Sequence, residues 1–314
     1  MVKILVNDGI EVSGKVMLEA AGFEVDMNNI PQEELITKLQ AYDAICVRSA
    51  TKVRKDLIDA CPNLKVIARG GVGLDNIDVE YAKSKGIKVI NTPAASSRSV
   101  AELAFAHLFG LVRFLNKSNQ TMPATGASNF AGLKKAYAKG VELEGKTLGL
   151  IGMGRIGQEA AKIAIGIGMN VVAFDPFVES VELTIGNAQF NTKATLVKSP
   201  LDELLQKADF ITLHVPGLAQ PILNKAEFDK MKDGVILINC ARGGVVDEDA
   251  MLEALNSGKV SAAGIDVYDN EPNPREDILT HPKVSLTPHI GAATGEAQEK
   301  VGGELASQLI SILS

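Results

Sequence analysis

Arg242, Glu271 and His289 each come shortly after a Val- and Ile-rich segment that is typical of a buried strand. Ligands of open parallel sheets bind beyond the carboxyl ends of the strands. We therefore expect these three side chains to face a ligand. A lone arginine or glutamate after a strand is also common at a protein surface, and the spacing alone does not show that the three meet.

The three residue types would suit the oxidation of an alcohol that also carries a carboxylate. An imidazole has an ordinary pKa near neutrality, so His289 is the natural base for the hydroxyl proton. Glu271 would orient the imidazole and stabilise its protonated form. The planar guanidinium of Arg242 would bind a carboxylate through two parallel hydrogen bonds.

The other three histidines fit the role of base less well. His107 lies in the middle of a helical segment, where we expect it to be packed, and His281 precedes Pro282 in a loop, where we expect it to be solvated. His214 ends an apolar segment, and two roles stay open for it: contact with a cofactor or capping of the turn.

A glycine pattern of dinucleotide-binding folds lies upstream of these residues. Gly152, Gly154 and Gly157 form G-x-G-x-x-G between an apolar segment and an Ala-rich helical one, and Asp175 follows about 20 residues later. The glycines permit a tight turn, approach of a pyrophosphate and close helix packing, and the helix start supplies N–H groups to the phosphates. A carboxylate at Asp175 would accept hydrogen bonds from both ribose hydroxyls and repel a 2′-phosphate, which predicts NAD. A purely structural glycine turn is the alternative, and this context disfavours it.

Strands and helices alternate in two series along the chain, which predicts an α/β fold with two doubly wound parallel sheets. Strands of the first series are expected at 3–6, 44–47, 65–68 and 88–91, with helices at 12–21, 33–40, 55–60 and 79–85. Strands of the second series are expected at 147–152, 170–174, 210–215, 235–239, 262–267 and 284–286. Between the series lie a helix from about Ser99 and a polar stretch at 117–140, where a domain transition is expected.

Length and composition are ordinary for a soluble globular protein of one large or two medium domains. The 314 residues are 46% hydrophobic and 22% charged, with a formal net charge of −6 and no block of like charge, so we expect neither nucleic acid nor a membrane as partner. The N-terminal apolar run is too short for a signal peptide, and the apolar stretch at 100–115 is too short to span a bilayer. Three cysteines without metal-ligand spacing indicate reduced thiols, no metal site and a cytoplasmic location.

Several motifs resemble those of the D-isomer-specific 2-hydroxyacid dehydrogenases, and the likeness covers essentially the whole chain. It is strongest to the branch that oxidises 3-phosphoglycerate. The motifs, in chain order, are Val47–Val53, Gly70–Asn76, Asn91–Pro93, Ser97–Leu103, the glycine fingerprint, Asn239–Asp247 and Thr287–Thr294.

The resemblance implies a domain plan that spacing alone does not give. A Rossmann NAD-binding domain at 98–287 is inserted in a flavodoxin-like substrate domain made of 1–97 and 288–314. The final helix thus returns to the N-terminal domain, and the active site lies in the cleft between the domains. A homodimer is expected, through the cofactor domain and the stretch at 117–140.

The resemblance also assigns roles to residues. The catalytic triad corresponds to Arg242, Glu271 and His289. Cofactor contacts carry over to Gly152, Gly154, Arg155, Ile156, Gly157, Asp175, His214, Val215, Pro216, Cys240, Ala241, Asp266 and Gly291, with Asp266 on the nicotinamide side. Substrate contacts carry over to the cations Arg48, Arg69 and Lys135 and to the backbone around Gly71 and Val72.

The activity implied is oxidation of D-3-phosphoglycerate to 3-phosphohydroxypyruvate, the entry to serine synthesis. Reduction of hydroxypyruvate, glyoxylate or another 2-keto acid is the alternative within the enzyme class, and an NAD-sensing corepressor is a remote alternative outside it. The sequence departs from the branch in three places: it has no Trp, Val215 replaces a common Thr, and Val72 replaces a common Thr or Ala. Since the chain ends soon after the last family helix, we do not expect feedback through a serine-binding domain.

Overall fold

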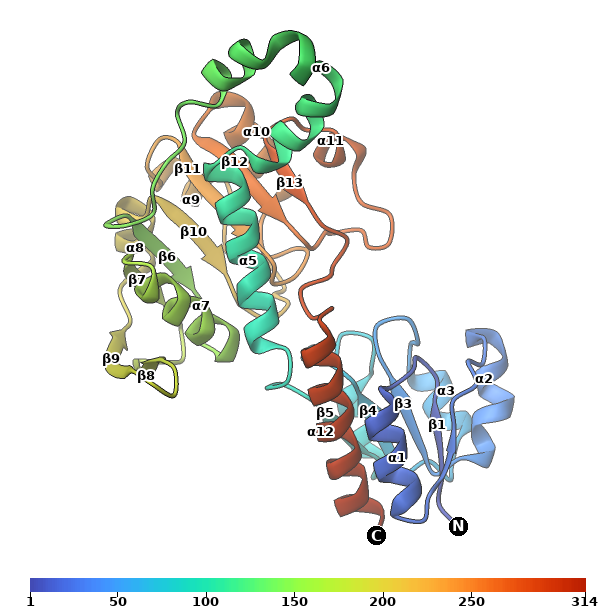
Figure 1. Cartoon of the computed structure of the whole chain (residues 1–314). Helices are drawn as coiled ribbons and strands as arrows, with labels where there is room; N and C mark the ends of the chain where they lie inside the picture. Colours follow the sequence, from blue (N-terminus) through green and yellow to red (C-terminus); the bar gives the residue numbers. More distant parts are fainter. The chain divides into compact units, whose positions relative to one another are not determined.

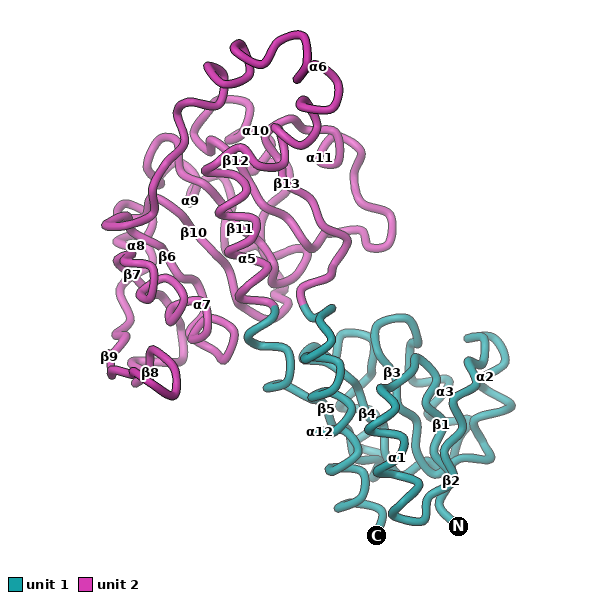
Figure 2. The backbone as a smooth tube through the Cα atoms, viewed as in Figure 1, with its two compact units in different colours: residues 1–99, 292–314 teal, residues 100–291 magenta.

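The computed structural model describes all residues, 1–314, and they divide into two compact units (Figure 2). Unit 1 consists of residues 1–99 and 292–314, and unit 2 of residues 100–291. These unit boundaries lie two residues after the expected 97/98 and four residues after the expected 287/288. As a consequence, His289 lies in the unit that carries the glycine fingerprint.

Unit 1 contains a five-stranded parallel sheet in the order β2-β1-β3-β4-β5, the flavodoxin-like arrangement (Figure 1). Its strands are β1 (Lys3–Val6), β2 (Glu24–Asp26), β3 (Ala44–Val47), β4 (Val66–Arg69) and β5 (Lys88–Asn91). Its helices are α1 (Val12–Ala20), α2 (Gln32–Lys38), the 3-10 turn η1 (Leu39–Ala41), α3 (Lys55–Ala60), α4 (Val79–Ser84) and α12 (Gly295–Leu313).

Alternate side chains of these strands build two apolar layers. Ile4 and Val6 of β1 pack with α1 and α12, whereas Leu5 packs with α2, α3 and α4 on the other face. All four residues of β3 are buried, which is why its sequence is continuously apolar. The C-terminal helix α12 packs beside α1, as the domain plan expected.

Unit 2 contains a six-stranded parallel sheet in the order β13-β12-β11-β10-β6-β7 and a separate hairpin. Its strands are β6 (Thr147–Ile151), β7 (Asn170–Phe174), β8 (Ser180–Gly186), β9 (Asn191–Val197), β10 (Phe210–Leu213), β11 (Val235–Asn239), β12 (Val260–Ile265) and β13 (Val284–Leu286). Its helices are α5 (Ser97–Val112), which begins in unit 1, α6 (Leu115–Ala136), α7 (Arg155–Gly166), α8 (Leu201–Lys207), α9 (Lys225–Lys230), α10 (Glu248–Ser257) and α11 (Glu276–Leu279).

Helices cover both faces of this sheet as well. Buried residues of α5 and α7 pack against one face, and residues of α8, α9 and α10 pack against the other (Figure 1). All ten strands expected from the sequence are present, displaced by two residues at most. The fold class is therefore confirmed.

Three strands were not expected. The short β2 has no buried residue, and the antiparallel pair β8 and β9 is an insertion after β7. The hairpin touches the sheet edge through a parallel bridge between Ala173 and Lys198. A third parallel strand commonly extends a dinucleotide-binding sheet at this edge, and here the hairpin follows β7 instead.

The stretch at 117–140 is not a domain transition. Residues 115–136 form α6 inside unit 2, separated from α5 by Phe114 in the left-handed conformation, and the helix is kinked at Asn129. The polar, Gly- and Ala-containing composition suggested a transition, but α6 covers the stretch as far as Ala136. No helix of the chain is both long and apolar enough to cross a membrane.

Candidate active site

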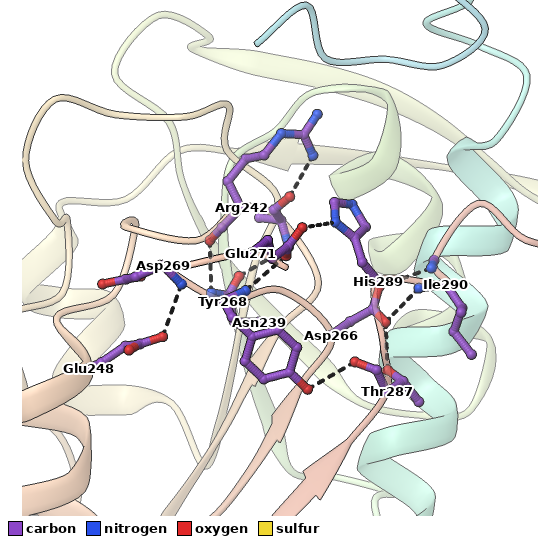
Figure 3. Close-up of polar contacts among 12 residues, drawn as sticks. Asn239, Arg242, Glu248, Asp266, Tyr268, Asp269, Glu271, Thr287, His289 and Ile290 are labelled. Atoms are coloured by element: carbon purple, nitrogen blue, oxygen red, sulfur yellow. Dashed lines mark hydrogen bonds and ion pairs between the residues drawn. The ribbon is translucent and has the colours of Figure 1, made fainter. Parts of the chain in front are cut away.

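His289 and Glu271 form a hydrogen-bonded pair beyond the carboxyl ends of β12 and β13 (Figure 3). The Nδ1 atom of His289 lies 2.8 Å from Oε2 of Glu271, and the two side chains are 44% and 35% exposed. An ionised carboxylate only accepts hydrogen bonds, so Nδ1 carries the proton and Nε2 of the neutral ring keeps its lone pair. The other Glu271 oxygen, Oε1, accepts the backbone N–H of Tyr268 at 3.0 Å. The pair can therefore take up a proton at Nε2.

Arg242 follows β11, the strand next to β12 in the sheet. Its Nη1 donates to the carbonyl of Ala241 at 2.6 Å, and its own carbonyl accepts from the Asn239 amide at 3.1 Å. The next residue, Gly243, contacts the loop that carries Glu271, since a Cβ there would overlap the carbonyl of Tyr268. All three predicted residues thus follow neighbouring strands at the carboxyl edge of one sheet.

Asp266 holds the turn that carries His289. Its side chain is 1% exposed, and Oδ1 accepts from the Ile290 N–H at 2.8 Å while Oδ2 accepts from the Gly291 N–H at 2.9 Å. Oδ1 also accepts from the Thr287 hydroxyl at 2.6 Å. Both oxygens are engaged with the protein, which supports an anchoring role for a residue expected to contact the cofactor.

The glycine fingerprint has the geometry that a dinucleotide needs. Gly152 has φ +101, and a Cβ there would lie 2.6 Å from the His214 carbonyl, whereas a Cβ on Gly157 would overlap the carbonyl of Gly152. Gly154 has open space around its Cβ position, which leaves room for a phosphate. The 12-residue helix α7 begins directly after it at Arg155, and Ile156 follows in its first turn. These residues fit a bound pyrophosphate.

Backbone N–H groups occupy most of the acceptor positions of the Asp175 carboxylate. Oδ2 accepts from Met153 N–H at 2.8 Å, and Oδ1 accepts from the N–H groups of Phe177 and Val178 at 2.8 and 3.1 Å. A carboxylate accepts about four hydrogen bonds, so roughly one position is left for a ribose hydroxyl rather than the two expected. The negative charge that disfavours a 2′-phosphate remains.

His214 packs beneath the fingerprint. Its Nε2 lies 3.1 Å from the Thr212 hydroxyl, and its Nδ1 has no hydrogen-bond partner. The His214 carbonyl and the Val215 side chain both lie close to Gly152. Burial lowers the pKa of His214 to about 4, so the ring is neutral at pH 7. Pro216 follows this turn. Of the remaining cofactor candidates, Cys240 and Ala241 are buried directly after β11, and Gly291 lies against Asp266.

The buried state of His214 predicts acid sensitivity of folding. In the unfolded chain the imidazole takes up a proton near pH 6.5, but in the folded protein it does so only near pH 4, so stability falls as pH drops through that window. Between pH 7 and 5, protonation of this group in the unfolded chain lowers the free energy of unfolding by up to about 2 kcal/mol. In urea unfolding, the free energy of unfolding of His214→Gln should fall less between pH 7 and 5 than that of the parent. The control His281→Gln changes a histidine in a loop, and its free energy of unfolding should fall nearly as much as that of the parent. An unchanged pH dependence in His214→Gln would contradict the assignment.

The predicted substrate residues Arg48, Arg69, Gly71 and Val72 lie in unit 1, at the carboxyl edge of its sheet. Arg48 follows β3, with its N–H donated to Asp8 at 2.6 Å and its carbonyl accepting from Asn76 at 2.8 Å. Arg69 ends β4, and its guanidinium lies against Gly71, since a Cβ there would lie 2.5 Å from Nη1.

Part of the predicted carboxylate-binding backbone is already in use. Gly71 has φ +144, and its N–H donates to the Thr92 hydroxyl at 2.8 Å. The Val72 carbonyl accepts from Asn91 at 2.6 Å. An anion in this loop would therefore be bound by the N–H groups of Val72 and Gly73, and not by that of Gly71. Lys135 lies in the last turn of α6 in unit 2, on its exposed surface.

Other residues of the site were not predicted. Tyr268 supplies the N–H that fixes Glu271, and its hydroxyl donates to the Thr287 carbonyl at 3.0 Å. Burial raises the pKa of this phenol to about 12, so it stays protonated and can donate. Asn239, the last residue of β11, accepts from Ala241 N–H and donates to the Arg242 carbonyl. An asparagine at a strand end is a turn signal that could have indicated this role.

A parallel sheet with a glycine fingerprint and an acid–base pair at its carboxyl edge describes a nicotinamide-dependent dehydrogenase. The chain belongs to the D-isomer-specific 2-hydroxyacid dehydrogenases. Residues 105–291, more than half of the chain, match the sequence model of the D-isomer specific 2-hydroxyacid dehydrogenase NAD binding domain. It is accordingly an oxidoreductase that uses NAD(H).

Individual relatives cover the whole chain. It is 43% identical to a hydroxypyruvate reductase from Thermotoga maritima, over 99% of this chain and 98% of the relative. It is 42% identical to a D-3-phosphoglycerate dehydrogenase from Methanocaldococcus jannaschii, over 100% of this chain but only 58% of that longer protein. Among solved structures, a glyoxylate reductase from Paecilomyes thermophila is similar with a TM-score of 0.79 and 29% identity, over 99% of this chain and 94% of that one.

Proposed function

We propose that the protein oxidises D-3-phosphoglycerate to 3-phosphohydroxypyruvate with NAD. The observation that carries the proposal is the pair of arginines at the carboxyl edge of the unit 1 sheet. Arg48 has a backbone clamped by Asp8 and Asn76, and Arg69 lies against Gly71 at the end of the next strand. A phosphorylated acid carries more negative charge than lactate or glyoxylate, and arginine is the side chain best suited to bind phosphate.

The residues of unit 2 would supply the acid–base chemistry. Bound NAD supplies the acceptor for the hydride that leaves C2. The hydroxyl proton passes to Nε2 of His289 as the C2–O bond becomes a carbonyl, and Glu271 stabilises the imidazolium through Nδ1. Arg242 binds the substrate carboxylate and so holds C2 in place. In the reducing direction the imidazolium returns its proton to the carbonyl oxygen.

The role of Arg48 is tested by Arg48→Gln, with the nearby surface cation changed in Lys52→Gln as a control. A charge-assisted hydrogen bond contributes about 1.5–3 kcal/mol, so KM for D-3-phosphoglycerate should rise roughly 10- to 100-fold in Arg48→Gln. KM for unphosphorylated hydroxypyruvate, assayed in the reducing direction, should change about twofold or less. Equal effects on both substrates, or none on either, would remove phosphate binding from the role of Arg48.

Reduction of hydroxypyruvate or glyoxylate is the second candidate. It is favoured by the hydroxypyruvate reductase of Thermotoga maritima, which the chain matches over 98% of the relative's length, whereas it spans little more than half of the phosphoglycerate dehydrogenases. Side-by-side measurement of kcat/KM decides between the two. Fast reduction of hydroxypyruvate without turnover of D-3-phosphoglycerate would overturn our choice of substrate but leave the reaction type in place.

We also propose a cytoplasmic homodimer. Free, buried Cys46, Cys61 and Cys240 suit a reducing compartment. Leu115, Met122 and Phe130 of α6 are all more than 40% exposed, which suits an interface with a second copy. Sedimentation equilibrium should give twice the chain mass, and a monomer at micromolar concentration would contradict the dimer.

A further inference from the structure

A chain of buried polar groups connects helix α5 to the turn that carries His289. His107, 4% exposed, lies in α5 with Nδ1 2.8 Å from the Ser285 hydroxyl and Nε2 3.0 Å from the Thr287 hydroxyl. Asn116 donates to the Ser285 hydroxyl at 2.5 Å. Thr287 in turn donates to Oδ1 of Asp266 at 2.6 Å.

The direction of each hydrogen bond in this chain is fixed by its two ends. The Asp266 carboxylate can only accept hydrogen bonds, so the Thr287 hydroxyl donates its hydrogen to Asp266. The Thr287 oxygen must then accept from Nε2–H of His107. Burial disfavours a second proton on the ring, so Nδ1 of His107 accepts the Ser285 hydrogen, while the Ser285 oxygen accepts from Asn116. The ring is therefore neutral and protonated at Nε2. Burial lowers the pKa of His107, which favours the same state.

The sheet lets helix α5 approach closely at His107. Gly264 in β12 has no side chain, and a Cβ there would lie 2.7 Å from Cβ of His107 and 2.9 Å from Cγ. The same ring lines an open pocket of about 440 Å³ together with Asn116, Ser285 and Thr287. A histidine packed only for its volume would not need a hydroxyl partner at each ring nitrogen, as His107 has in Ser285 and Thr287.

The other end of this series of hydrogen bonds is the turn that carries His289. This residue has φ +54, a left-handed conformation that is unfavourable for a residue other than glycine and persists only where its surroundings impose it. Asp266 imposes it here, because its two oxygens hold the N–H groups of Ile290 and Gly291 directly after His289. Thr287 is the third donor to the Asp266 carboxylate.

We propose that His107 is a positioning residue for the reaction: its Nε2–H fixes Thr287, Thr287 fixes Asp266, and Asp266 fixes the backbone that aims the His289 ring. The proposal rests on the role proposed for His289 as the proton acceptor. The hydrogen bonds of the relay side chains go to one another and to Asp266, and not to His289, Glu271 or the fingerprint glycines. The relay therefore affects the reaction through the backbone that carries His289.

The test compares His107→Leu, which removes both ring nitrogens, with His107→Gln, whose amide can still donate to Thr287. His281→Gln is the control for loss of a histidine outside the relay. In His107→Leu, kcat should fall roughly tenfold or more while KM for NAD(H) changes about twofold or less. His107→Gln should recover most of kcat. Hydrogen exchange of the Ile290 and Gly291 amides should be faster in His107→Leu than in His107→Gln.

Two results would overturn the relay. One is wild-type kcat and wild-type amide exchange in His107→Leu. The other is equal loss of kcat in His107→Gln and His107→Leu, in step with their loss of thermal stability, which would make His107 a packing residue. If His107→Leu does not fold, Thr287→Val and Thr287→Ser form the same pair, since only serine keeps the hydroxyl. Retained turnover in His289→Ala would overturn the proposed base, whereas the amide exchange tests the relay independently.

Discussion

Replacing His289 with alanine is expected to lower kcat by about 10²- to 10⁴-fold, the usual contribution of a positioned general base. The variant loses the only group of the pair that can take the hydroxyl proton, because Nε2 is the ring nitrogen not bonded to Glu271. Binding of NADH should change little, since the fingerprint residues belong to β6 and α7 and not to the turn after β13. Steady-state kinetics and a fluorescence titration with NADH measure the two quantities.

The matched control is His281→Ala, which removes a histidine from the loop before β13. It should retain kcat within about twofold. Near-normal turnover in His289→Ala would assign the proton to another group. A parallel loss of NADH affinity would instead indicate that the variant disturbs the fold of unit 2.

Replacing Arg242 with glutamine is expected to lower kcat/KM for the 2-hydroxy acid by about 10²- to 10³-fold. The estimate combines a lost charge-assisted pair of hydrogen bonds to the carboxylate, about 1.5–3 kcal/mol, with misplacement of C2. KM for NAD should stay within about twofold, because the proposed contact is to substrate. Glutamine keeps a single donor nitrogen and no charge, so the variant loses the charged fork that bridges two carboxylate oxygens.

Arg113→Gln, at an exposed position after α5, serves as the control for loss of an arginine in the same unit. It should show parent kinetics. Equal increases in KM for NAD and for the acid in Arg242→Gln would indicate a structural role for the guanidinium instead. The loop that carries Arg242 packs against Tyr268 through Gly243.

Much of the sheet architecture followed from the sequence because parallel strands are continuously apolar and are separated by helices. The hairpin β8–β9 was not predicted because it is antiparallel and half exposed, so Val181, Leu183 and Ile185 alternate with polar residues and form no continuous apolar run. The stretch at 117–140 misled in the opposite way, because its polar, glycine-containing sequence is typical of a connection and yet residues 117–136 lie within α6.

The site was predictable where position along a strand determines chemistry, and not where distant contacts do. Arg242, Glu271 and His289 follow three adjacent strands, so one rule placed them all. The partners of His107 lie 178 and 180 residues away, and no local pattern indicates such a pairing. The carboxylates of Asp175 and Asp266 were expected to serve the cofactor, but backbone N–H groups and the Thr287 hydroxyl occupy most of their acceptor positions.

Hydride transfer from C2 of D-3-phosphoglycerate to NAD is the central claim, and isotope tracing tests it most directly. The enzyme is incubated with D-3-phosphoglycerate deuterated at C2 and NAD, and the reduced cofactor is analysed by mass spectrometry. We expect the deuterium in the nicotinamide ring of the product, and in Arg48→Gln the same label at lower yield. Reduced cofactor without the label, or none formed while hydroxypyruvate is reduced rapidly, would contradict the account.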